Sequence, residues 1–217
     1  EVIELTESLM RDHATPERLL ALENSGNRID LELWAALREA GLTTAGIAES
    51  HGGAGFTFAE ACLVLEQAGR TTAAAPLLPH LVGLHTLERC QAWAELEAFA
   101  RGAGWLAVSA RTGRGNTLRL EHGRISGEIR VVPYAQGAEA CLLPVRAAEG
   151  WVLCLVGLGQ AVALELQIAT DKSPAARLTL DGAPGRALGG ADLLAWMRQR
   201  LLAGTCSMQA GVVEEAI

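Results

Sequence analysis

The side chains that could ligate a metal or act as nucleophiles are spread through this sequence without forming a chemical cluster. The five histidines have no metal-ligand spacing alongside acidic or cysteine partners: His13, His51, His80, His85 and His122. The cysteines are odd in number, contain no C-x-x-C pair and lie mostly in apolar runs: Cys62, Cys90, Cys141, Cys154 and Cys206. We therefore expect no metal site, and we interpret the cysteines as buried free thiols in a reducing compartment.

One glycine-rich loop carries positive charge. Gly113-Arg114-Gly115 follows Arg111 at the end of a short apolar run. A phosphate-binding loop of the P-loop kind requires a strand before the glycines and a helix after them, and this context is missing here. The loop is therefore not expected to bind a nucleotide in that way.

Composition disfavours several classes of function. The chain has 217 residues, half of them hydrophobic, which is enough for one large or two modest domains with a sizeable core. Its 18 basic and 25 acidic residues give a net charge of −7, which disfavours a nucleic-acid-binding surface because phosphate binding needs a net basic footprint. No apolar run approaches the ~20 residues of a membrane-spanning helix, and the start does not resemble a signal peptide. We expect a soluble, cytoplasmic protein with neither a nucleic acid nor a membrane as partner.

Helical periodicity extends from residue 1 to about residue 103. Asp30 is placed to cap one helix, and Gly41 is the type of residue that ends it. Thr57, with Glu60 three residues later, has the spacing of a capping box at the start of another helix. We expect an N-terminal helical domain over residues 1–103.

The periodicity changes at Gly104 and changes back at Ala191. Short apolar or alternating runs separated by turn residues predict strands at 105–109, 118–120, 124–126, 129–132, 140–145, 151–156, 161–166 and 178–180. His122-Gly123 lies between two of these runs, at an expected hairpin turn. We expect an all-β domain, sandwich- or barrel-like, over residues 104–185.

The helical pattern that begins at Ala191 continues to Ile217 without a cap or a stop signal. We interpret residues 186–217 as the first helix of a truncated C-terminal helical domain. The predicted fold class is therefore α+β, with an N-terminal helical domain, a middle all-β domain and the start of a C-terminal helical domain.

The segment that ends at Arg70 contains a specific sequence motif. The pattern D-x-x-L-W-x-x-L-x-x-x-G-L begins at Asp30, Glu49 precedes G-G-x-G, and E-x-x-x-x-x-E-x-x-G-R follows. This pattern resembles the N-terminal helical domain of the acyl-CoA dehydrogenase family, which usually has Val-Pro-Glu where this chain has Ile47-Ala48-Glu49. The resemblance implies an FAD-dependent oxidation of an acyl-CoA thioester to its 2-enoyl-CoA, in fatty acid or sterol degradation.

Two segments of the expected β-domain correspond to the flavin contacts of this family. Val108 and Ser109 correspond to the strand in which the family has a Thr that hydrogen-bonds the pyrimidine edge of the flavin. The alternative interpretation is an ordinary strand that enters a glycine-rich turn. Val131, Val132 and Tyr134 stand in the second segment, with Val131 at the position of an aromatic residue. The resemblance implies that these five residues bind FAD.

The resemblance also bears on substrate and catalysis. In this family the glycine-rich loop runs close to CoA, so Arg111 and Arg114 are possible contacts to the CoA phosphates, and surface arginines without a role are the alternative. The catalytic carboxylate of the family lies in the C-terminal helical domain, later than Glu214 and Glu215, which we interpret as a solvated helix face. The catalytic residue is therefore unknown.

Two functional interpretations follow from the resemblance. The first is an enzyme with an acyl-CoA substrate, an electron-transfer flavoprotein as electron acceptor, and a homo- or hetero-oligomer that includes an acyl-CoA dehydrogenase-like subunit. The second is a catalytically degenerate partner that supports a catalytic homologue. The second interpretation draws on the Val-Pro-Tyr-Ala wording at residues 132–135, which looks like that of divergent, smaller subunits of heteromeric enzymes.

Overall fold

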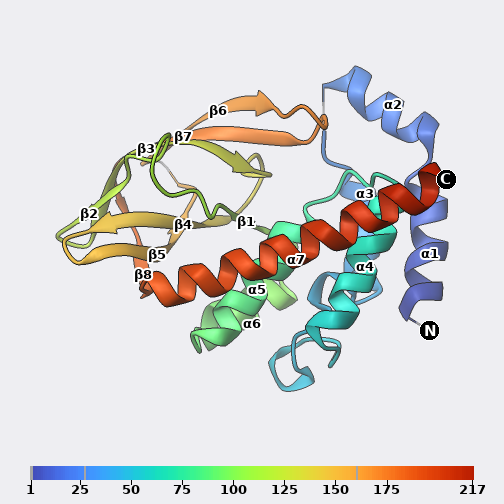
Figure 1. Cartoon of the computed structure of the whole chain (residues 1–217), viewed down its shortest axis with the longest axis horizontal. Coiled ribbons are helices and arrows are strands. Elements are labelled where there is room, and N and C mark those ends of the chain that lie inside the picture. The colour runs from blue at the N-terminus through green and yellow to red at the C-terminus, as the bar shows by residue number, and fades with distance from the viewer. Residues whose placement is uncertain (1, 27, 160) are drawn as a thin grey trace.

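Helices make up the chain before Gly104. In the computed structural model, which describes residues 2–26, 28–159 and 161–217, they lie together on one side of the molecule (Figure 1). The α-helices are α1 (Val2–His13), α2 (Pro16–Ser25), α3 (Leu31–Glu39), α4 (Phe58–Arg70), α5 (Leu77–Arg89) and α6 (Trp93–Arg101). Two short 3-10 helices lie between α3 and α4: η1 (Leu42–Thr44) and η2 (Glu49–His51).

Local capping explains where these helices begin and end. The Asp30 side chain accepts hydrogen bonds from the backbone amides of Glu32 and Leu33, at 3.1 and 2.9 Å, and so caps α3. Thr57 and Glu60 form the predicted capping box at the start of α4. Gly41 takes the left-handed conformation, with φ of +72°, just after α3. These three predictions are confirmed.

The helices join the sheet through buried tryptophans. Trp34 of α3 donates from Nε1 to the Ala103 carbonyl at 2.9 Å, and its ring meets the ring of Trp105 edge-on with centroids 5.9 Å apart. Both tryptophans are more than nine-tenths buried. Since burial of one large apolar side chain contributes roughly 1.5–3 kcal/mol, this contact fixes the position of the first strand relative to α3.

The described strands form one mixed sheet in the order β6-β7-β3-β2-β4-β5-β8, with β1 paired to β4. The strands are β1 (Leu106–Val108), β2 (Arg119–Glu121), β3 (Arg124–Pro133), β4 (Ala140–Ala147), β5 (Gly150–Gly157), β6 (Val162–Ile168), β7 (Pro174–Pro184) and β8 (Arg186–Gly189). Most neighbours are antiparallel, whereas β1 and β2 both run parallel to β4. The predicted hairpin turn at His122-Gly123 is confirmed, because Glu121 pairs with Arg124 across it. The predicted α+β class is confirmed as well.

Three details differ from the sequence-based expectation. Residues 124–126 and 129–132 belong to one strand, β3. The register of this strand shifts between Ile125 and Gly127, where the apolar pattern of the sequence is interrupted. Strand β8 was missed, because four residues with no apolar alternation give no strand signal, yet it pairs with β5. Of the five cysteines, all free, only two are fully buried; Cys62 and Cys90 are partly exposed and Cys206 is exposed. The division into three domains stays a prediction.

The last helix, α7 (Ala191–Ala216), connects the two sides of the molecule. Its 26 residues span about 39 Å at 1.5 Å per residue, from the end of β8 across α5 to α4 (Figure 1). It crosses α4 so closely that backbones touch: a Cβ on Gly211 would lie 1.9 Å from the Glu66 carbonyl oxygen, and one on Gly69 would lie 2.0 Å from the Met208 carbonyl oxygen. Only glycine fits at these two positions.

Candidate functional site

The turn that follows β1 contains the first predicted flavin segment. Ser109 is 5% exposed, and its polar atoms are engaged within the chain. Its amide donates to the Leu142 carbonyl at 3.0 Å, and its hydroxyl donates to the Val131 carbonyl at 3.5 Å while accepting from the Arg111 amide at 3.3 Å. Val108 is buried beside α5. The sequence-predicted hydroxyl is thus present, and it holds the turn together.

A bulge in β3 presents the second predicted segment. The register of β3 against β7 shifts between Ile129 and Val132. Val131 lies within this bulge, partly exposed and adjacent to Ser109, whereas Val132 is fully buried. Bulges commonly re-aim side chains beside functional sites. Among the three valines predicted to contact a flavin, Val131 is therefore the one that reaches the surface.

Tyr134 is directed elsewhere. Its backbone has φ of +54°, its amide donates to the Pro174 carbonyl at 2.9 Å, and its carbonyl accepts from Trp105 Nε1 at 2.8 Å. Its side chain lines a cavity that also borders Asp171. Burial, together with the negative charge of Asp171, raises the pKa of Tyr134 to about 12, so the phenol is protonated at neutral pH. Neither Ser109 nor Val131 is among the described residues that line this cavity.

Two residues that the sequence analysis missed hold the glycine-rich loop in place. Arg198 of α7 donates from Nη2 to the Ala110 carbonyl at 2.9 Å and to the Thr112 hydroxyl at 3.2 Å. Buried Asn116 donates from Nδ2 to the Arg111 and Pro144 carbonyls, both at 2.8 Å. Asparagine next to glycine is a turn signal that could have identified Asn116. No local pattern could have paired Arg198 with a loop more than eighty positions earlier.

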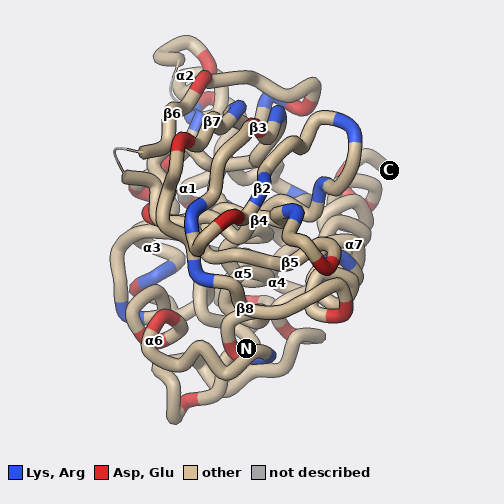
Figure 2. The backbone as a smooth tube through the Cα atoms, turned by 90° about the vertical axis from the view of Figure 1, so that its left-hand side faces the viewer, with Lys and Arg blue, Asp and Glu red and all other residues tan. Residues whose placement is uncertain are grey.

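The sheet side of the molecule is more basic than the helical side. Residues 104–189 contain nine basic and seven acidic residues, whereas residues 1–103 contain seven basic and fifteen acidic ones. Figure 2 shows Lys and Arg distributed over the strands and loops at the sheet end of the molecule. Arg111 and Arg114, the predicted CoA contacts, are exposed here, and neither forms an ion pair within the described residues.

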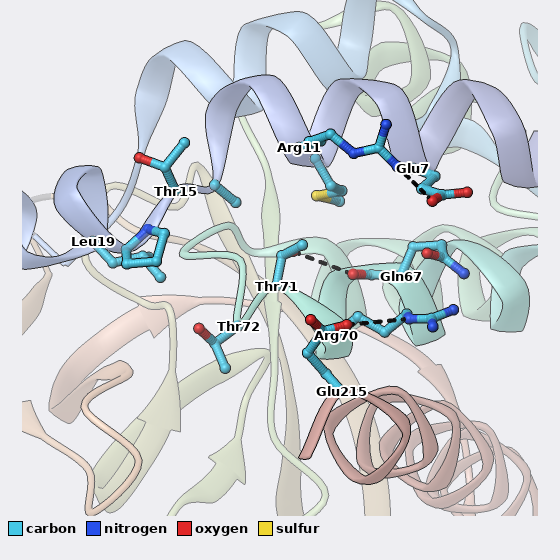
Figure 3. Close-up of a pocket in the computed structure, with 12 residues that line it drawn as sticks. Glu7, Arg11, Thr15, Leu19, Gln67, Arg70, Thr71, Thr72 and Glu215 are labelled. Atoms are coloured by element: carbon cyan, nitrogen blue, oxygen red, sulfur yellow. Dashed lines mark hydrogen bonds and ion pairs between the residues drawn. The ribbon is translucent and has the colours of Figure 1, made fainter. Parts of the chain in front are cut away.

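A cavity of about 540 Å³ lies between α1, α4 and the end of α7 (Figure 3). Its charged groups pair with each other: Arg11 Nη2 lies 2.7 Å from Glu7 Oε1, and Arg70 Nε lies 3.7 Å from Glu215 Oε2. Glu214 also pairs with Arg70, at 3.2 Å. Both glutamates of α7 are exposed, so they occupy the solvated face predicted for them.

The buried histidines are structural. Burial, together with the positive charge of Arg38, lowers the pKa of His80 to about 3, and its Nδ1 accepts from the Leu106 amide at 3.1 Å. Burial and the charge of Arg200 lower the pKa of His85 to about 4. Both imidazoles are therefore neutral at pH 7. Within the described ranges, no group of three His, Cys, Asp or Glu side chains is placed to hold a metal ion.

These contacts determine how this segment could meet a flavin. Val131, Ala110 and Thr112 are partly exposed around the turn and offer a mainly apolar face. The Ser109 hydroxyl and amide, which the pyrimidine edge of a flavin would need, are already bonded within the chain. The residues therefore fit an apolar contact with the ring, and they do not fit a set of hydrogen bonds supplied by this turn alone.

Comparison with known proteins agrees with the resemblance seen in the sequence. The family model described as acyl-CoA dehydrogenase, N-terminal domain, matches residues 1–88. Acyl-CoA dehydrogenase FadE27 of Mycobacterium tuberculosis is 28% identical over 227 residues, which cover 98% of this chain and 61% of that protein. The helices, the sheet and the long α7 thus define an acyl-CoA dehydrogenase fold.

Two solved structures show the same arrangement throughout the chain. The Tcur3481-Tcur3483 steroid ACAD G363A variant has a TM-score of 0.90 and 32% identity, covering 99% of this chain and 63% of that chain. The ChsE4-ChsE5 complex from Mycobacterium tuberculosis has a TM-score of 0.90 and 28% identity, with the same coverage. Residues 1–88 thus match the N-terminal domain of the acyl-CoA dehydrogenase family, and the chain shares the fold of these relatives while spanning less than two thirds of their length.

Within the described residues, no helix combines the length and the apolar character needed to cross a membrane.

Proposed function

We propose that this chain acts within an FAD-dependent acyl-CoA dehydrogenase, which converts an acyl-CoA thioester to its 2-enoyl-CoA, and that it pairs there with a second acyl-CoA dehydrogenase-like subunit. Two of its structural relatives are named as pairs of chains, Tcur3481-Tcur3483 and ChsE4-ChsE5. Within that assembly, the apolar surface at Val131 lies against the flavin ring. The bulge that exposes Val131 beside the turn of Ser109 is the observation that carries this proposal.

The bound flavin would supply the redox chemistry, while the protein orients it and the substrate. This chain contributes Val131 as an apolar wall and Arg198 as the tie that holds the turn in place. Arg111 and Arg114, exposed and without ion pairs in the described residues, contact the CoA phosphates. The acyl group is bulky, of the steroid kind for which one relative is named. Electrons pass to an electron-transfer flavoprotein.

A second candidate function is that of a supporting partner that contributes little chemistry. The engagement of the Ser109 hydroxyl and amide within the chain favours it, because these atoms are not free to bind a cofactor. In that case the partner subunit supplies the polar contacts to the flavin.

Absorbance spectroscopy distinguishes these functions. The chain is purified alone and together with an acyl-CoA dehydrogenase-like partner subunit, and the visible absorbance band of the oxidised flavin is compared. We expect a band in the pair and little in the chain alone.

Val131→Asp tests whether this surface touches the flavin. The change buries a charge against the ring, so the complex should lose most of its flavin and its turnover. Leu164→Asp, on the edge strand β6 and 39% exposed, is the matched control and should retain both. If Val131→Asp leaves flavin content and turnover of the assembled complex unchanged, the surface is not a flavin contact and the supporting-partner function holds.

A further inference from the structure

A second cavity, of about 360 Å³, lies where helices and sheet meet. It is bounded by α2, the end of α4, the β6–β7 loop and α7, four segments that converge at one end of the molecule (Figure 1). Small side chains of Ala68, Ala73 and Ala74 form part of its wall, and Met208 and Val212 of α7 form another part. Its volume is within the range of small-molecule sites, which are mainly apolar with a few polar groups.

Two hydrogen-bond donors of this cavity lack partners. Arg28, whose side chain is 15% exposed, has no hydrogen bond at Nε within the described part of the chain, whereas its Nη1 forms an ion pair with Glu23. The Tyr134 hydroxyl likewise has no hydrogen-bond partner among the described residues. Arg28 Nε is buried, and a buried donor without a partner destabilises the folded chain, a penalty that a ligand acceptor would remove. The cavity therefore offers two donors, Arg28 Nε and the Tyr134 hydroxyl.

The charges around the cavity cancel. Arg28 Nη1 lies 3.2 Å from Glu23 Oε1, and Asp171 and Lys172 follow each other in the β6–β7 loop. Two cations and two carboxylates leave no net charge at the site. An anionic ligand would lack a net counter-charge here, while a neutral oxygen acceptor matches the free donors.

The backbone around the cavity is held in an uncommon conformation. Five non-glycine residues have positive φ in the described chain, and three of them line this cavity: Thr72 at +49°, Tyr134 at +54° and Lys172 at +68°. Such conformations are disfavoured for residues with a side chain and tend to gather where side chains must point at a ligand. Here the conformation turns the Tyr134 phenol away from the β3 bulge and into the cavity.

We propose that this cavity binds a neutral, compact apolar molecule carrying a carbonyl oxygen, which accepts a hydrogen bond from the Tyr134 hydroxyl. The small alanines leave room for a broad hydrocarbon body, and the free Nε–H of Arg28 reaches a second oxygen where the ligand has one. Binding in this cavity needs no flavin and no partner subunit, so it can be measured on the chain itself.

The single tyrosine of the chain gives a direct probe. Incorporated 3-fluorotyrosine gives one fluorine resonance, that of Tyr134, and 2-decalone is titrated against it. We expect a saturable shift with 2-decalone and a weaker response to the carboxylate of the same ring system. Absence of a saturable shift overturns the proposal, and tighter binding of the carboxylate overturns its assignment to a neutral acceptor.

Variants then locate the binding. Tyr134→Phe should weaken 2-decalone binding about five- to tenfold by calorimetry, the equivalent of one hydrogen bond. Val212→Trp, at the 45% exposed rim, should fill the cavity and abolish binding. Leu202→Trp, on the same helix and 60% exposed, is the matched control and should bind as the parent chain does. Equal binding by Val212→Trp and the parent chain, with equal melting temperatures, places the ligand elsewhere and refutes the site.

Discussion

The crossing of α4 with α7 and the turn after β1 use their residues in opposite ways. At the crossing, Gly69 and Gly211 bring two backbones into contact, and the geometry leaves no room for any other residue. At the turn, side chains of Ser109, Asn116 and Arg198 hold the backbone, although the sequence of this segment differs from the flavin-binding motif that is usual in the family. Backbone contact thus limits the crossing to glycine, whereas side-chain hydrogen bonds hold the turn.

The largest expected effect breaks the crossing. Gly211→Val would place a side chain 1.9 Å from the Glu66 carbonyl oxygen and 2.9 Å from the Arg70 amide, and neither backbone atom can move aside alone. We expect a loss of about 3 kcal/mol in the free energy of unfolding, measured by urea denaturation. Gly159→Ala, where a Cβ would meet nothing within 4 Å, is the control and should change stability little. A Gly211→Val chain as stable as its parent would show that the helices do not cross this closely.

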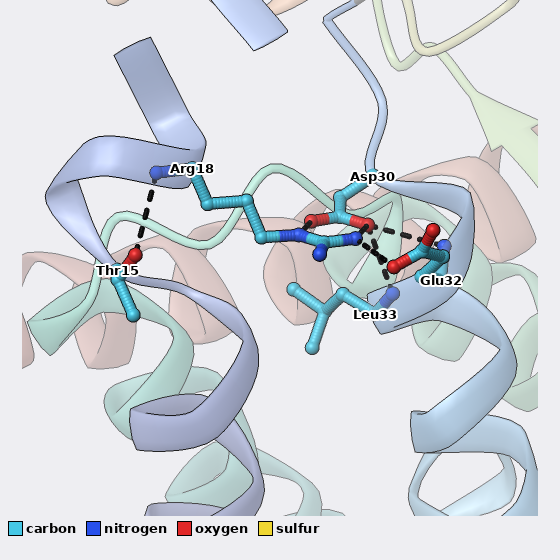
Figure 4. Close-up of polar contacts among 5 residues, drawn as sticks. All are labelled: Thr15, Arg18, Asp30, Glu32 and Leu33. Atoms are coloured by element: carbon cyan, nitrogen blue, oxygen red, sulfur yellow. Dashed lines mark hydrogen bonds and ion pairs between the residues drawn. The ribbon is translucent and has the colours of Figure 1, made fainter. Parts of the chain in front are cut away.

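An intermediate effect is expected at the start of α3. Asp30, 3% exposed, caps the helix and pairs with Arg18, which also reaches Glu32 (Figure 4). Asp30→Ala removes the cap and the ion pair, so we expect unfolding to become easier by about 2 kcal/mol. Asp30→Asn keeps a capping side chain without the charge, and it should lose less.

The same residue predicts a dependence on pH. Burial alone would raise the pKa of Asp30, but the hydrogen bonds from Arg18 and from the Leu33 and Glu32 amides outweigh it and hold that pKa below its usual value. A lowered folded-state pKa contributes stability that is present above the unfolded pKa of about 3.9 and is lost as the pH falls through the folded value. The free energy of unfolding should therefore fall less between pH 7 and pH 3 in Asp30→Asn than in the parent chain. An equal fall in the two chains would contradict this ionisation.

The smallest expected effect concerns the turn. Arg198→Ala removes two hydrogen bonds from an exposed side chain, which should cost only about 0.5–1 kcal/mol of global stability. Amide hydrogen exchange should rise over residues 110–116 and remain unchanged across β5. Arg114→Ala, in the same loop but without these bonds, is the control. Equal exchange in the two variants would mean that α7 does not hold the loop.

How much could be predicted from the sequence depended on how local each interaction was. The caps at Asp30 and Thr57 and the turn at His122 are set by residues within four positions, and they were predicted correctly. Strand β8 carries too few residues for a pattern. The roles of the five residues predicted to bind FAD stay predictions.

The direction of Tyr134 was beyond the sequence for a different reason. Nothing in the residue type signals a left-handed backbone at a tyrosine, and the contacts that hold it come from Pro174 and Trp105, each about thirty or more positions away. The tie from Arg198 to Ala110 is likewise set by the tertiary fold. Sites assembled from distant segments leave little local signal in a single sequence.

The glycine contact between α4 and α7 has a consequence for how the chain folds. Gly69 and Met208 touch across about 140 positions, and closing so long a flexible loop would cost about 4 kcal/mol in chain entropy. Prior folding of the intervening sheet shortens that span, because β8 delivers the start of α7 to the helices. We expect α7 to dock late, after the sheet has formed. The apolar side of α4 therefore stays exposed to solvent during synthesis until α7 has emerged from the ribosome.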